Sequence, residues 1–198
     1  MSEQVPANAA PVALKEWAAV IDALLQGRQI MLLRKGGIIE ETREFQLVSP
    51  SFYLLPGYEH QREELLKEEA RGLVAQTLKT WQPGQTYVTL RAYGRVTDDI
   101  EIRDQETLDL LRDQHVWTDR FAEERLRWKK RNPLHLLLVR VYRLADEAKV
   151  PLLPAYTGCK SWVRLASNPG LDGATPVLGD DAYEAAVGDV KRRLGLLH

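Results

Sequence analysis

The chain has 198 residues, of which 44% are hydrophobic, and its 27 basic and 28 acidic side chains give a formal net charge of −1. That length is enough to bury a core without disulfides, and the near-neutral balance requires neither a nucleic-acid nor a membrane partner, while leaving room for a local basic patch. We expect a disordered tail at residues 1–11, which are small, polar and proline-punctuated, followed by one domain at residues 12–198.

The cysteine content and the apolar runs set further limits. The lone Cys159 excludes an internal disulfide and a thiolate metal cluster. No run approaches the ~18 apolar residues that span a bilayer, and the N-terminal sequence lacks the basic start and apolar centre of a secretory signal. The sequence also has no Walker loop and no His-Glu-x-x-His motif. We therefore expect a cytoplasmic protein with no cofactor and no metal.

Apolar spacing predicts the elements of the first half of the chain. Leu14, Trp17 and Ile21 recur at helical spacing and Gly27 suits a helix end, so a first helix is expected, with Glu16 and Asp22 facing water. The further predicted elements are strands at 29–34, 38–41 and 44–48, a short apolar run at 52–55, and a helical segment at 60–81 that Gly72 divides.

The second half contains the clearest strand. Residues 86–96 alternate, with one apolar face and one face that carries two tyrosines and two arginines, including Arg95. The other predicted helices lie within 101–113, at 118–128 with Thr118 as its cap, and at 181–194. A long strand is predicted at 134–144, and extended segments at 150–155 and 161–165. Because the strands cluster without regular alternation with helices, we expect an α+β fold with a mixed, largely antiparallel sheet and flanking helices.

A glycine turn carries the first candidate site. Arg34 and Lys35 precede Gly36 and Gly37, and Glu40 follows. Such a turn presents backbone N–H groups, and with two cations beside it the turn is suited to hold a phosphate. The alternative is an ordinary hairpin with charged rims.

Two further turns carry candidate groups. His60 follows Glu59 at the start of a predicted helix, where an imidazole suits a base or a ligand, and the alternative is a plain helix entry. Cys159 lies beside Lys160, which favours a lowered thiol pKa, and Trp162 follows; the alternative is a structural cysteine in a tight glycine turn.

A basic band follows the predicted helix at 118–128. Its members are Arg120, Arg125, Arg127, Lys129, Lys130 and Arg131, with Trp117 and Trp128 close by in sequence. Basic groups with interleaved aromatic rings suit a nucleic-acid surface, whereas Glu123 and Glu124 dilute the charge and favour a solvated helix face.

One short pattern suits a metal-dependent nuclease. Glu147 and Lys149 have the spacing of a restriction-type core, and Asp98 is a candidate for the partner acid. Three-residue patterns of this kind are common by chance. A protein-interaction module without a small ligand is the other alternative, and its mark would be a large exposed apolar patch.

Several motifs together resemble one family. They are Ala13–Trp17, Leu33–Ile38 with Glu40, Pro56–Gln61 and Tyr156–Val163. In this order they resemble the uncharacterised bacterial family called domain of unknown function 1802, over residues 13–165. The resemblance implies no catalytic residue.

We therefore predict that the chain binds an anionic ligand, a nucleic acid or a nucleotide, at one rim of the sheet. The residues assigned to this rim are Arg34, Lys35, Gly36, Gly37, Glu40, His60, Arg95, Cys159, Lys160 and Trp162. In this hypothesis the basic groups contact phosphate, the tryptophan stacks on a base, and the histidine orients the ligand or exchanges a proton.

Overall fold

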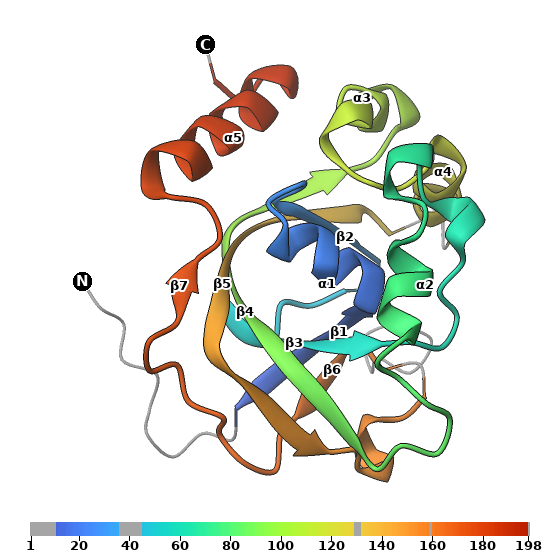
Figure 1. The fold of residues 1–198 in the computed structure, drawn as a ribbon. Helices are drawn as coiled ribbons and strands as arrows, with labels where there is room; N and C mark the ends of the chain where they lie inside the picture. Colours follow the sequence, from blue (N-terminus) through green and yellow to red (C-terminus); the bar gives the residue numbers. More distant parts are fainter. Residues whose placement is uncertain (1–10, 36–44, 129–131, 159, 198) are drawn as a thin grey trace.

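The computed structural model describes residues 11–35, 45–128, 132–158 and 160–197 (Figure 1). Within them the strands are β1 (Val12–Trp17), β2 (Met31–Arg34), β3 (Ser51–Gly57), β4 (Tyr87–Ile102), β5 (Leu134–Pro151), β6 (Trp162–Arg164) and β7 (Thr175–Pro176). The helices are α1 (Ala18–Leu25), α2 (Leu73–Leu78), α3 (Gln105–Asp109), α4 (Asp119–Arg127) and α5 (Asp180–Arg193). Short 3-10 turns are η1 (Glu63–Leu65), η2 (Glu68–Ala70), η3 (Arg112–Gln114) and η4 (Pro154–Tyr156).

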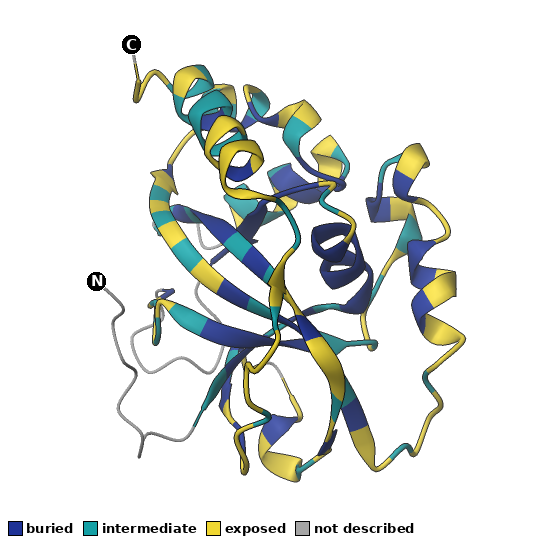
Figure 2. Cartoon of the chain, turned by 60° about the vertical axis from the view of Figure 1, so that its left-hand side comes forward, coloured by how far each residue is buried: buried dark blue, intermediate teal, exposed yellow. Residues whose placement is uncertain are grey.

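The strands form one mixed, mostly antiparallel sheet, so the predicted α+β class is confirmed. The order is β2-β5-β4-β3-β1-β6, with β7 paired to β5, and β1 runs parallel to β3. The long β4–β5 pair has register shifts at Leu90/Ala92 and at Val96/Asp98, which bend and twist the ribbon. The sheet consequently curves around α1, which is buried along its whole length (Figures 1 and 2).

A side chain links strands near the two edges of this curved sheet. β6 pairs with only the first half of β1, at Val12–Leu14. Farther along β1, Arg34 of β2 donates from Nη1 to the Lys15 carbonyl and to the Glu16 carboxylate, both at 3.2 Å. At this end of the sheet, β2 and β1 are therefore linked by the Arg34 side chain and not by backbone hydrogen bonds between paired strands.

The prediction for the first helix is wrong over residues 12–17. Ala13 belongs to a smaller core cluster and Leu14 to the main one, so successive side chains are buried on opposite faces of the sheet, as a strand requires. Glu16 and Asp22 do not face water either, since both are buried and Asp22 pairs with Arg91 of β4.

The other elements show where sequence patterns were sufficient. Strands are confirmed within 29–34, where β2 begins only at Met31, and at 86–96 and 134–144, where β4 and β5 extend beyond the predicted C-terminal ends. Residues 60–81 are helical only in short pieces, which Gly72 divides at a φ of 92°. Residues 45–48 form no strand, while the Gly36-Gly37 turn and the strand at 38–41 lie outside the described residues. Of the predicted tail only Pro11 is described, and its carbonyl accepts from the Leu165 N–H at 2.8 Å.

Gly94 marks the tightest packing in the sheet. A Cβ at this position would lie 2.8 Å from Cγ1 of Val139 and 3.1 Å from Cε2 of Phe52, and both neighbours are buried. We expect Gly94→Ala to lower the free energy of unfolding by about 1–3 kcal/mol, measured by urea denaturation. Gly179→Ala is the control, because Gly179 has an ordinary φ of −62° and open space at its Cβ. Equal stability of the two variants would contradict this account.

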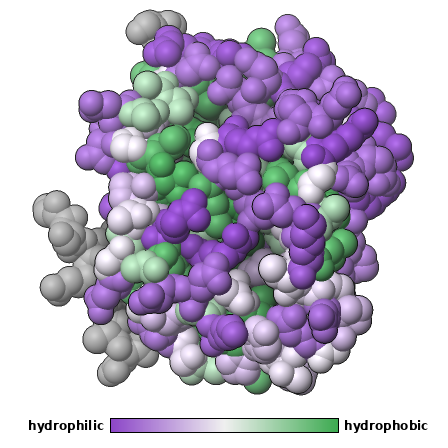
Figure 3. Space-filling view, viewed as in Figure 1, coloured by the Kyte–Doolittle hydropathy of each residue, from purple (hydrophilic) through white to green (hydrophobic). Residues whose placement is uncertain are grey.

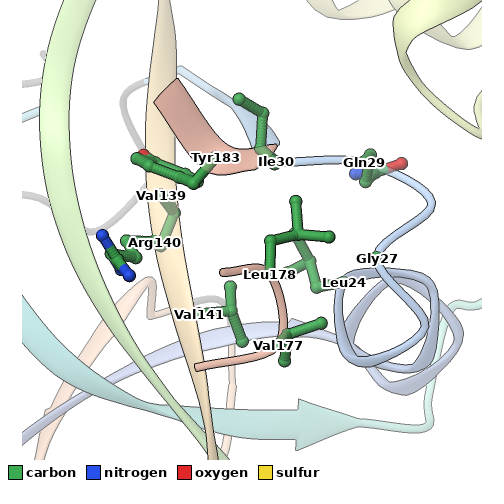
Figure 4. Close-up of a pocket in the computed structure, with 10 residues that line it drawn as sticks. All are labelled: Leu24, Gly27, Gln29, Ile30, Val139, Arg140, Val141, Val177, Leu178 and Tyr183. Atoms are coloured by element: carbon green, nitrogen blue, oxygen red, sulfur yellow. The ribbon is translucent and has the colours of Figure 1, made fainter. Parts of the chain in front are cut away.

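The C-terminal helix α5 lies against the outside of the sheet. Tyr183 is buried, and its hydroxyl lies 2.8 Å from the Thr97 hydroxyl, while most of the outer face of α5 is exposed (Figure 2). Between this region and β5 is a cavity of about 10 Å³, which Leu178 and Val139 help to line (Figure 4). A space of this size holds at most one water, so the junction serves packing. The described helices all fall short of the length and apolar character that a membrane crossing requires.

Candidate functional site

Arg34 and Lys35 lie at the end of β2 and are both buried. Besides the contacts of Arg34 Nη1 with Lys15 and Glu16, its Nε is buried and has no hydrogen-bond partner among the described residues. The Lys35 ammonium donates to the Leu126 carbonyl in the last turn of α4, and burial lowers the pKa of this lysine. Both cationic side chains are thus fixed in the protein interior, near the C-terminal end of β2.

Trp162 belongs to the same end of the sheet but is packed inward. Its ring stacks on Phe45 with centroids 6.1 Å apart and meets Phe52 edge-on at 5.2 Å, and its indole N–H donates to the Gln46 carbonyl at 3.0 Å. The Arg34 guanidinium lies 5.9 Å from the centroid of Phe45. The structure therefore brings Arg34, Lys35 and Trp162 together around one aromatic ring and one helix end.

The remaining predicted residues are placed differently. His60 is exposed in the turn after β3, with a φ of 66°, and Lys160 is exposed just before β6. Arg95 is exposed opposite Ser51, at the start of β3, so the length of this seven-residue strand, about 20 Å, separates Arg95 from the His60 end. Four other predicted residues lie outside the described ranges, namely Gly36, Gly37, Glu40 and Cys159.

Helix α4 places an aromatic cluster over the end of β2. The ring of Phe121 stacks on Trp117 at 5.4 Å and contacts Trp17 of β1 at 5.3 Å. One turn later in α4, the Arg125 guanidinium lies 5.1 Å from the centroid of the Phe121 ring. A cavity of about 330 Å³ opens beside it, here called the Arg125 pocket, and it is lined by Leu65, Phe121, Glu124, Arg125 and Trp128.

The charges beneath this pocket are unbalanced. Burial lowers the pKa of Arg125, the nearby Arg34 lowers it further, and Glu16 opposes both effects. Among the residues that the structure describes, the Arg125 guanidinium has no hydrogen-bond acceptor. Because the Glu16 carboxylate is hydrogen-bonded to Arg34 and Arg125 has no acceptor among the described residues, the site is suited to accept an anion or an electron-rich edge of a ligand.

The basic band on α4 divides into two kinds of side chain. Arg120 pairs with Glu124 at 2.9 Å and Arg127 with Glu123 at 3.5 Å, both exposed, as a solvated helix face would have them. Arg125 alone of the described members turns toward the aromatic cluster. The i, i+4 spacing of Phe121 and Arg125 was the available signal, since residues four apart share a helix face. No sequence spacing indicated a role for Glu16, because its partner Arg34 lies on another strand.

The nuclease pattern does not assemble. On the β4–β5 pair, Asp98 lies opposite Leu138 and Lys149 lies opposite Thr89. Glu147 is therefore about 30 Å along β5 from the level of Asp98, which pairs with Lys191 at 2.5 Å. The described residues also contain no group of three or more His, Cys, Asp or Glu side chains placed to hold a metal. Asp98 is thus too far from Glu147 and Lys149 for the three side chains to hold one metal ion.

Apolar groups on the face seen in Figure 3 are interleaved with hydrophilic ones. Green side chains appear over the centre of this view and purple ones surround them. Large exposed apolar residues are found along the chain as Val48, Leu78, Tyr87, Leu110, Trp128, Leu152, Leu171, Leu196 and Leu197. Trp128 is the one of these that lines the Arg125 pocket.

Comparison with known proteins identifies a family without an assigned activity. No curated protein matches the sequence. The solved structure of ASCH from Zymomonas mobilis has a TM-score of 0.44 and 9% identity to this chain, over 90% of this chain and 94% of that one. A family model described as a domain of unknown function matches residues 13–189. The match spans most of the sequence and includes β2, α4, all of β1 except its first residue, and all five residues that line the Arg125 pocket. The chain therefore belongs to the family named domain of unknown function DUF1802.

Proposed function

We propose that this protein binds a nucleotide or a single-stranded nucleic acid in the Arg125 pocket. The observation that carries the proposal is the half-buried guanidinium of Arg125, which lies in an aromatic pocket without an acceptor among the described residues. A donor withdrawn from water without a partner is unfavourable, and a ligand that supplies an acceptor removes this cost.

The shape and lining of the pocket support a ligand with a flat ring. Its volume of about 330 Å³ is within the range of small-molecule sites. Trp128 lines the pocket and is 37% exposed, and an indole ring is of the kind that stacks on nucleic-acid bases. Leu65 adds an apolar side chain to the lining.

Arg34 and Lys35 support binding through their positive charge. Their hydrogen bonds to Glu16 and to the Leu126 carbonyl hold them at the end of β2, next to α4, so in this proposal they strengthen the local positive potential without leaving these internal partners. His60 and Lys160, which are exposed at the same end of β1 and β3, are proposed as outer contacts for a longer oligonucleotide.

Titration of a fluorescently labelled single-stranded RNA and of nucleoside monophosphates at several salt concentrations tests the proposal. Arg125→Gln should weaken binding about tenfold or more, because a hydrogen bond to a charged group is lost. Arg127→Gln is the matched control, since Arg127 is exposed on the same helix and pairs with Glu123 outside the pocket. If neither RNA nor any nucleotide binds at low salt, or if both variants lose affinity equally, the proposal is wrong.

A further inference from the structure

We infer that the Arg125 pocket selects guanine; this inference rests on the proposed function and names the base that the pocket takes. Two adjacent residues of α4, Glu124 and Arg125, line the pocket together with the indole of Trp128. The lining of the pocket thus includes both a carboxylate acceptor and a guanidinium donor, together with an indole ring. A pocket built for phosphate alone would gain nothing from the carboxylate, which repels anions.

Guanine matches this pair of groups better than the other bases do. Its N1–H and N2–H₂ groups are parallel donors that one carboxylate can accept together, and its O6 and N7 are acceptors that one guanidinium can contact together. Adenine has no pair of parallel donors, and its N1 lone pair would face the carboxylate. Cytosine and uracil lack the N7 acceptor and likewise present lone pairs toward a carboxylate.

Both side chains are held in place before a ligand arrives. Oε1 of Glu124 accepts from Nε of Arg120 at 2.9 Å, one helical turn away. Arg125 lies over the Phe121 ring, and that ring is itself packed on Trp117. Helix α4 is fixed at its start by Thr118, whose hydroxyl accepts from the Phe121 N–H at 3.3 Å. A donor and an acceptor fixed on one rigid helix lower the ordering cost of binding.

Calorimetric titration of the full chain with GMP, AMP, CMP and UMP tests the inference. We expect GMP to bind at least about tenfold more tightly than the other three, as expected for well-formed bidentate base contacts. Glu124→Gln should weaken GMP binding about tenfold and leave AMP binding within about threefold. Glu123→Gln is the control, because this neighbouring glutamate pairs with Arg127 and does not line the pocket.

The outcomes separate this inference from the proposed function. If the four nucleotides bind equally and Arg125→Gln weakens all of them, the guanine assignment is wrong and nucleotide binding stands. If none binds and a single-stranded oligouridine with one internal guanosine also fails, both are wrong. The protein could also bind that oligomer more tightly than GMP and lose this binding when the guanosine is replaced by adenosine. This result would support the inference and identify single-stranded RNA as the source of the base.

Discussion

Replacing Glu16 by glutamine is expected to lower the free energy of unfolding by about 3–5 kcal/mol, the cost of leaving a buried charge without its partner. Glu16 is 9% exposed, its Oε2 lies 3.2 Å from Nη1 of Arg34, and its Oε1 accepts from the Trp17 N–H at 2.8 Å. Without this carboxylate the guanidiniums of Arg34 and Arg125 repel each other in a poorly hydrated region. Urea denaturation at pH 7 measures the loss.

The chain offers a matched comparison at its surface. Glu101 also pairs with an arginine, Arg103 at 2.6 Å, but both side chains are at least half exposed, so Glu101→Gln should cost less than about 1 kcal/mol. Replacing both Glu16 and Arg34 by leucine should restore much of the stability that Glu16→Leu alone removes, because no unpaired charge remains between the two strands. Equal losses for Glu16→Gln and Glu101→Gln would contradict this reading of the buried pair.

Mild acid is expected to destabilise the protein by up to about 3 kcal/mol as the pH falls from 6.5 toward 4. The cause is His115, which is 4% exposed and whose Nδ1 has no hydrogen-bond partner among the described residues. Burial, together with the Lys67 ammonium, lowers the pKa of His115 from 6.5 to about 4, and the Trp117 backbone and Asp119 oppose this effect only in part. Within this window the unfolded chain holds one proton more than the folded chain, so the free energy of unfolding falls as the pH falls.

Urea denaturation at intervals between pH 7.5 and 4.5 measures this dependence. His115→Gln removes the titrating group, so its stability should change less between pH 6.5 and 5 than that of the wild type. Val116→Ala is the control, because it creates a small cavity at a buried neighbouring residue and keeps the imidazole. Its free energy of unfolding should be lower than that of the wild type and should change with pH to the same extent. A slope for His115→Gln that equals the wild-type slope would show that other groups cause the acid sensitivity.

Local patterns in the sequence were enough for the elements that local interactions define. Helix α4 begins at the predicted Thr118 cap, and β4 keeps the alternation that predicted it. The first strand was missed because its pairing, with β3 on one side and β6 on the other, comes from distant segments. Apolar residues from Leu14 to Leu25 happen to fit a helical repeat, which only the second part of that range adopts.

The sequence was enough to predict which charged residues belong to the candidate site, but not how they are arranged in space. The sequence singled out Arg34, Lys35 and the basic band that contains Arg125, and the structure brings these three cations to the end of β2 and the last turns of α4. That Arg34 pairs with Glu16 while Lys35 bonds to the Leu126 carbonyl depends on three separate segments meeting, and no spacing in the sequence reports such a meeting. Trp162 was predicted to stack on a base, whereas its ring packs against Phe45 and Phe52, and Trp128 lines the pocket instead.

The position of β1 has a consequence for how the chain is made. Leu14 pairs with Leu54 on one side and with Trp162 on the other, so β1 leaves the ribosome long before β6, its second neighbour, has been synthesised. Contacts so distant in sequence form slowly, and an unpaired strand edge can meanwhile pair with another chain. A nascent or truncated chain that ends before β6 therefore exposes the edge of β1, which makes the synthesis of β6 the step that protects this edge from self-association.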